Sequence, residues 1–147
     1  MILDIFKTGV YYTECNLDID KIKNFCVTHS YNNESRQLSN EGGYQSEDIN
    51  LLDHDVLAPL HSKIVLEANV FANGMYLKDQ NIDNAWININ SYKDTNVMHC
   101  HPGVALSGVF YVNVPEDGGN IVFECPGSEL KDFAWYGQLD HENWNHY

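Results

Sequence analysis

The stretch MHCHPGVALSGVFYV, residues 98–112, places two histidines directly before a run of aliphatic and aromatic residues. Runs of this composition, bounded by turn residues, are typical of buried strands. Pro115 follows the run, and Glu116-Asp117-Gly118-Gly119 predicts a turn into a second apolar run over residues 120–124. We therefore expect residues 104–124 to form a hairpin.

The preceding part of the chain has helical periodicity. Asp18 or Asn16 is the expected N-cap of a helix of about 12 residues, and a second helix is expected over residues 53–75. Residues 3–13 predict a strand, and the polar residues 30–50 predict a loop or a bulged hairpin. Because helices precede consecutive strands, the sequence predicts an α+β fold, with the N-terminal helices packed on one face of an antiparallel sheet.

The charge balance disfavours several classes of partner. The chain has 21 acidic and 8 basic residues, a formal net charge of −13. This disfavours nucleic acid, whose phosphates require clustered Lys and Arg, and anionic membrane surfaces. No apolar run approaches the roughly 20 residues of a membrane span, and the N-terminus lacks the basic region of a secretory signal. We therefore expect a cytoplasmic protein without a membrane partner.

His99 and His101 are the candidate metal ligands. On a strand, residues two apart project to the same face, so both imidazoles could bind one metal ion. Imidazole suits Fe, Zn, Cu and Ni. The alternatives are a surface pair, or core histidines hydrogen-bonded to the backbone. A turn before the pair and Pro102-Gly103 after it favour the metal interpretation, while Cys100 between them is expected to pack on the opposite side.

Two imidazoles are an incomplete set of ligands. Non-haem Fe(II) oxygenases use two histidines and one carboxylate. The other residues with a suitable donor atom are Asp94, Asp117, Glu124, His141 and His146. The two aspartates are typical turn residues, and Glu124 is typical of a solvent-facing strand position. His141 and His146 are five apart, a spacing that places them on one face of neither a helix nor a strand, so the third ligand stays open.

Five segments of the sequence, taken in their order along the chain, resemble a known family. Together they are similar to the 2-oxoglutarate/Fe(II)-dependent oxygenases of tailed phages and marine bacteria. The resemblance spans about residues 36–126 and is carried by SNEGGYQS (39–46), NAWININ (84–90), HCHPG (99–103), LSGVFYV (106–112) and GNIVFECP (119–126).

The resemblance implies a double-stranded β-helix, the jelly-roll or cupin-like fold. It also implies Fe(II) as cofactor, 2-oxoglutarate as co-substrate, and hydroxylation of a small molecule or a protein side chain. His99 and His101 fall on the first metal motif of the family, where most oxygenases have a carboxylate at the second position. A site of three histidines is therefore an option.

Three further residues are expected to bind the co-substrate. Asn88 lies on the adjacent strand, which in related oxygenases lends a side chain to the co-substrate. Ser107 and Tyr111 are four apart on one expected strand, so they share a face and could line the same cavity. The alternatives are a serine that permits close strand packing and a buried tyrosine with a satisfied hydroxyl.

The family normally continues with a late strand that carries a distal histidine and then a basic residue for 2-oxoglutarate. This sequence stops at Tyr147, its only arginine is Arg36, and Lys131 comes too early. We therefore expect residues 1–147 to be a single, incomplete domain without the late strands. Its open sheet edge favours a homodimer or marginal stability. If the chain is phage-encoded, it belongs to the host cytoplasm.

Two other functions stay open, so enzymatic activity itself is uncertain. A cupin-like metal-binding protein, such as an isomerase or a sugar-binding module, also uses two histidines in this spacing. Its first motif has a glutamate a few residues later, where this chain has Val104-Ala105-Leu106. The second alternative is a non-catalytic structural relic of the fold.

Overall fold

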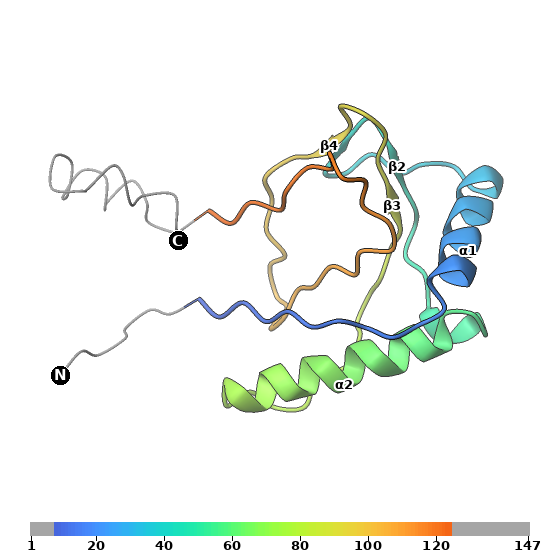
Figure 1. Cartoon of the computed structure of the whole chain (residues 1–147). Helices are drawn as coiled ribbons and strands as arrows, with labels where there is room; N and C mark the ends of the chain where they lie inside the picture. The colour runs from blue at the N-terminus through green and yellow to red at the C-terminus, as the bar shows by residue number, and fades with distance from the viewer. Residues whose placement is uncertain (1–7, 125–147) are drawn as a thin grey trace, which may run out of the picture. The chain divides into compact units, whose positions relative to one another are not determined.

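The computed structural model describes residues 8–124 (Figure 1). The chain divides into two units, Met1–Asn113 and Val114–Tyr147. All helices and strands of the described residues belong to the first unit. Among residues 8–124, no helix combines the length and the apolar character that crossing a membrane requires.

Helix α1, Ile19–Asn32, begins where the sequence predicts. The carboxylate of Asp18 accepts a hydrogen bond from the backbone N–H of Lys21 (3.2 Å), so Asp18 is confirmed as the N-cap. Ile22 is only 3% exposed, and Phe25 packs beside it against the core. The apolar face of the helix therefore faces the interior, as its periodicity predicts.

Helix α2, Ala58–Gly74, starts five residues later than expected. Pro59 lies in its first turn, the one place where a missing backbone N–H costs no helical hydrogen bond. The residues before it form a separate 3-10 turn, η1 Leu51–Asp53, which the side chain of Asn50 caps. The prediction of a helix over 53–75 is thus confirmed for residues 58–74 and wrong for its start, because Pro59 lies in the first turn.

The four strands are short and pair across the chain. Strand β1, Asn40–Glu41, pairs antiparallel with β4, Thr95–Asn96, and β2, Tyr44–Gln45, pairs antiparallel with β3, Asn88–Ile89. Figure 1 shows β2 beside β3. The pairing continues past the strands, since the N–H of Ser46 donates to Ile87 (3.0 Å) and that of Ile49 donates to Ala85 (2.7 Å).

Gly42 and Gly43 connect β1 to β2 in the left-handed region, with φ of +72° and +61°. A Cβ atom at Gly42 would lie 2.1 Å from the carboxylate of Asp94, and one at Gly43 would lie 2.6 Å from the side chain of Asn90. The same Asp94 carboxylate accepts a hydrogen bond from the N–H of Ser91 (2.7 Å). Asp94 is thus a turn residue, as expected, and the glycines allow that turn to pack closely.

The buried core lies between the helices and one face of the β3 segment. Its buried apolar residues are Ile22, Ile49, Leu51, Leu57 and Leu60. Ala85 and Ile87 pack against them from the β3 segment, and Phe110 and Val112 do so from the segment that follows the histidines. Because strand residues alternate, Trp86 and Asn88 face away from this core.

The strand expected near the N-terminus is absent from the described residues. Residues 8–13 contain no strand; instead the ring of Tyr11 stacks on Phe71 of α2 (centroids 5.7 Å apart) and its hydroxyl donates to Glu67 (2.6 Å). This segment therefore lies along α2. Gly9 permits the approach, since a Cβ atom there would lie 3.1 Å from the Phe71 ring.

The expected hairpin over 104–124 is not displayed by the described residues. Its turn forms, because the N–H of Gly118 donates to the carbonyl of Pro115 (2.9 Å), but none of these residues is in a strand. A strand needs the backbone of a partner, and residues 109–112 show the alternation without one: Val109 and Tyr111 are exposed, whereas Phe110 and Val112 are half-buried.

Helices and small antiparallel sheets confirm an α+β structure. The double-stranded β-helix is not displayed by residues 8–124 and stays a prediction.

Candidate metal centre

The segment that carries the two histidines starts directly after β4. The N–H of Val97 donates to the carbonyl of Ser39 (2.7 Å), which extends the pairing of β1 and β4 by one bond. Residues 97–101 are a loop rather than the strand that we expected. Cys100 is exposed instead of packed, because its neighbours do not follow the alternation of a strand.

The loop nevertheless brings the two imidazoles together. The ring centroids of His99 and His101 lie 4.9 Å apart, and their planes meet at 75°. Nδ1 of His99 lies 2.7 Å from the carbonyl oxygen of Val97. A carbonyl oxygen only accepts, so Nδ1 carries the proton and the lone pair of Nε2 is free. This is the arrangement that orients histidine ligands in metal sites.

His101 is half-buried against a residue that the sequence analysis did not single out for the site. Its ring centroid lies 5.6 Å from that of Trp86, at an interplanar angle of 32°. The sequence does contain a pattern that could have identified Trp86: in the alternating run Trp86-Ile87-Asn88, Trp86 lies on the same face as Asn88. The aromatic contact joins the β3 segment to the histidine loop.

The three predicted co-substrate residues are not brought together by any hydrogen bond. Asn88 is exposed in β3, directly opposite Gln45 of β2. Ser107 and Tyr111 are exposed in the segment after the histidines, and Tyr111 is 56% exposed. The buried tyrosine considered as an alternative is therefore wrong, whereas a role for the three residues in binding the co-substrate stays a prediction.

A third ligand is not apparent in the described part of the chain. Residues 8–124 contain no group of three His, Cys, Asp or Glu side chains that could hold a metal ion. The Asp94 carboxylate accepts a hydrogen bond within its own turn. Asp117 lies in the turn of the second unit. His141 and His146 lie outside the described residues. The two imidazoles fit a divalent transition metal as two of its ligands.

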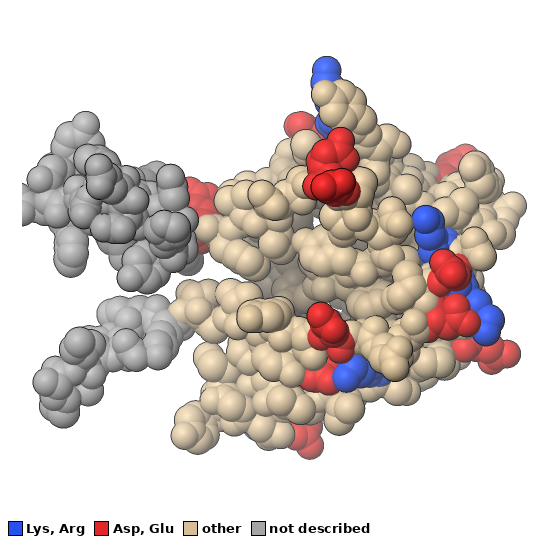
Figure 2. Space-filling model, in the orientation of Figure 1, with Lys and Arg blue, Asp and Glu red and all other residues tan. Residues whose placement is uncertain are grey.

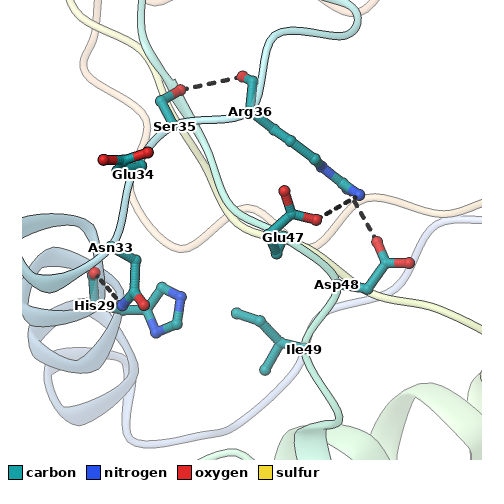
Figure 3. Close-up of a pocket in the computed structure, with 8 residues that line it drawn as sticks. All are labelled: His29, Asn33, Glu34, Ser35, Arg36, Glu47, Asp48 and Ile49. Carbon is teal, nitrogen blue, oxygen red and sulfur yellow. Dashed lines mark hydrogen bonds and ion pairs between the residues drawn. The ribbon is translucent and has the colours of Figure 1, made fainter.

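A cavity of the described residues lies elsewhere, beside Arg36 (Figure 3). It has a volume of about 520 Å³ and is lined by His29, Asn33, Glu34, Ser35, Arg36, Glu47, Asp48 and Ile49. The guanidinium of Arg36 contacts Glu47 (3.2 Å) and Asp48 (2.9 Å). Two carboxylates neutralise the arginine, so this cavity repels a dicarboxylate such as 2-oxoglutarate.

The surface around this cavity carries charges of both signs. Figure 2 shows acidic and basic side chains next to one another at the right, where α1 lies in Figure 1. Lys21 pairs with Asp18 at the start of that helix (2.8 Å). Among residues 8–124, Lys21, Arg36 and Lys63 pair with carboxylates.

Residues 84–144 match a family model described as "Putative 2OG-Fe(II) oxygenase". The matched range includes His99, His101, Asn88, Ser107 and Tyr111, and it supports the predicted oxygenase family. No curated protein and no solved structure shows significant similarity to the chain. A phage origin and the loss of late strands stay predictions.

Proposed function

We propose that the chain acts as an Fe(II)/2-oxoglutarate-dependent dioxygenase in which His99 and His101 bind the iron. The observation that carries this proposal is the pair of imidazoles 4.9 Å apart, one of them oriented by a backbone carbonyl. The pair lies inside the range that matches the oxygenase family. When bound, Fe(II) and 2-oxoglutarate supply the oxygen-dependent hydroxylation of a substrate C–H bond.

The protein residues bind and orient the reactants. His99 binds through Nε2, because its Nδ1 is held by Val97. Asn88, on the sheet face that also carries Trp86, offers an amide to the co-substrate, and Ser107 and Tyr111 offer hydroxyl groups. The substrate is a small molecule or a protein side chain. The charge of −13 argues against nucleic acid.

An anaerobic titration tests the proposal. The protein is titrated with Fe(II), with 2-oxoglutarate, and with both, while the visible absorption spectrum is recorded. A charge-transfer band that appears only when both are present supports the oxygenase. Succinate formed from 2-oxoglutarate in air is the second readout.

The other outcomes separate the remaining functions. Metal binding without a response to 2-oxoglutarate indicates a cupin-like metal protein. Binding of neither indicates a structural relic, and both results contradict the oxygenase. His61→Ala is the matched control for histidine variants of the site, because His61 lies on α2.

A further inference from the structure

Trp86 has a backbone that is held on both sides. The N–H of Ile49 donates to the carbonyl of Ala85 (2.7 Å), and the N–H of Ser46 donates to the carbonyl of Ile87 (3.0 Å). The hydroxyl of Ser46, a fully buried residue, also accepts from the N–H of Ile87 (2.9 Å). Hydrogen bonds to both chain neighbours therefore restrict the position of Trp86.

The direction of the indole follows from its neighbours. Ala85 and Ile87 pack against the core, so alternation turns Trp86 to the opposite side. The ring of His101 lies 5.6 Å from the indole, and the ring of His99 lies 4.9 Å from that of His101. His101 thus lies close to two aromatic rings, those of Trp86 and His99.

The two histidines are oriented by different means. His99 has a backbone acceptor, the carbonyl of Val97. The imidazole of His101 makes no hydrogen bond with any residue of the described part of the chain, and the aromatic contacts are what hold its ring. Metal-binding histidines normally receive their orientation from a hydrogen bond to the second ring nitrogen. At His101 the nearby indole of Trp86, tilted by 32° to the imidazole, takes the place of that hydrogen bond.

We propose that Trp86 is a positioning residue, which sets the orientation of the His101 imidazole for metal binding. This inference rests on the proposed function only in that His99 and His101 bind a metal ion. Loss of an orienting partner lowers metal affinity by about 10-fold to 100-fold in known sites. Removal of the indole is therefore expected to weaken metal binding about tenfold and to change the ligand field.

The experiment uses the full chain with Trp135→Phe and Trp144→Phe, so that Trp86 is the sole tryptophan. Co(II) is the probe, because its visible absorption reports ligand number and geometry and because it quenches nearby indole fluorescence. We expect Co(II) to quench Trp86 in this parent protein with the same midpoint that the absorption titration gives. Binding that leaves the fluorescence of Trp86 unchanged would overturn the inference.

Variants of Trp86 then separate orientation from general stability. Trp86→Phe keeps an aromatic ring, so we expect it to bind Co(II) with the affinity and absorption spectrum of the parent. Trp86→Leu keeps the apolar bulk without the ring, and Trp86→Ala removes both, so both should bind Co(II) about tenfold more weakly. Tyr92→Ala, an exposed aromatic residue of the same region (86% exposed), is the matched control.

The outcomes distinguish this inference from the proposed function. If the parent binds Co(II) and both Trp86→Leu and Trp86→Ala give unchanged affinity and spectra, the inference is wrong and the metal site stands. If the parent binds no metal, both this inference and the proposed metal site are wrong. Circular dichroism checks that each variant is folded. If Trp86→Ala unfolds, the comparison of the parent with Trp86→Leu decides the outcome.

Discussion

Nδ1 of His99 lies 2.7 Å from the carbonyl oxygen of Val97, two residues before it. The N–H of the same Val97 donates to Ser39, so the acceptor of the imidazole is itself tied to the strand pairing of β1 and β4. The proton position of a candidate ligand therefore depends on a backbone register set by a segment far earlier in the sequence.

Replacing either histidine should remove most of the metal binding. His99→Ala and His101→Ala each delete one of two imidazoles, and we expect each to lower the affinity for Co(II) or Fe(II) at least about tenfold. Isothermal titration calorimetry under anaerobic conditions measures the change. His61→Ala on α2 should bind as the unmodified protein does. Equal affinities for all three variants would show that the metal, if bound, is held elsewhere.

Gly42→Ala should destabilise the fold. Its φ of +72° disfavours a side chain, and the new Cβ atom would lie 2.1 Å from the Asp94 carboxylate and displace it from Ser91. We expect a loss of about 2–3 kcal/mol in the free energy of unfolding, measured by urea denaturation. Gly74→Ala is the control, because no atom lies within 4 Å of its Cβ position. Helix propensity predicts a gain of at most about 1 kcal/mol there.

Arg36→Ala should have a modest effect that depends on salt. The guanidinium, 23% exposed, holds two carboxylates that are themselves largely exposed, Glu47 at 76% and Asp48 at 54%. Exposed partners limit the contribution to about 1 kcal/mol. The difference from the unmodified protein should shrink in molar NaCl, because salt screens exposed charges. Arg36→Lys should recover part of it, and a salt-independent difference would contradict the electrostatic origin.

Glu67 should make stability depend on acid pH. Hydrogen bonds from the Lys63 ammonium and the Tyr11 hydroxyl hold the pKa of the Glu67 carboxyl below its ordinary value of 4.5. A lowered pKa means that the ionised form stabilises the folded state above pH 4.5, and that this contribution is lost as the pH falls through the lowered pKa.

A thermal melt of Glu67→Gln beside the unmodified protein tests this dependence. The melting temperatures should differ at neutral pH and converge as the pH falls below 4.5. Glu14→Gln, at an exposed position before α1, is the control and should show no such convergence. A constant difference down to the acid limit would mean that Glu67 acts through packing.

The helices were predictable because their signals are local. Asp18 caps α1 through a bond to a residue three positions away, and Ile22 faces the core as the period of 3.6 requires. The start of α2 shows the limit of that reasoning. Apolar periodicity runs back to Asp53, but Pro59 permits a helix only from Ala58.

The strands were harder, because each depends on a partner elsewhere in the chain. The aliphatic run around Phe110 predicts a paired strand with alternating exposure; the alternation occurs, but the described residues show no strand there. Residues 40–45, expected to be a loop or a bulged hairpin, instead form the partner strands of residues 88–96. The contact between Trp86 and His101 could not be predicted from the sequence either, because His101 lies in a loop whose position the sequence pattern does not define.

The pairing of β1 and β2 with β4 and β3 also bears on how the protein folds as it is synthesised. The bond between Ile87 and Ser46 spans 41 residues of chain, and that between Asn96 and Ser39 spans 57. Such high contact order makes these contacts slow to form, whereas α1 and α2 nucleate locally. On the ribosome, β1 and β2 must wait without a partner until β3 and β4 have left the exit tunnel. The two candidate ligands, His99 and His101, follow β4 in the chain, so they emerge only after these strands.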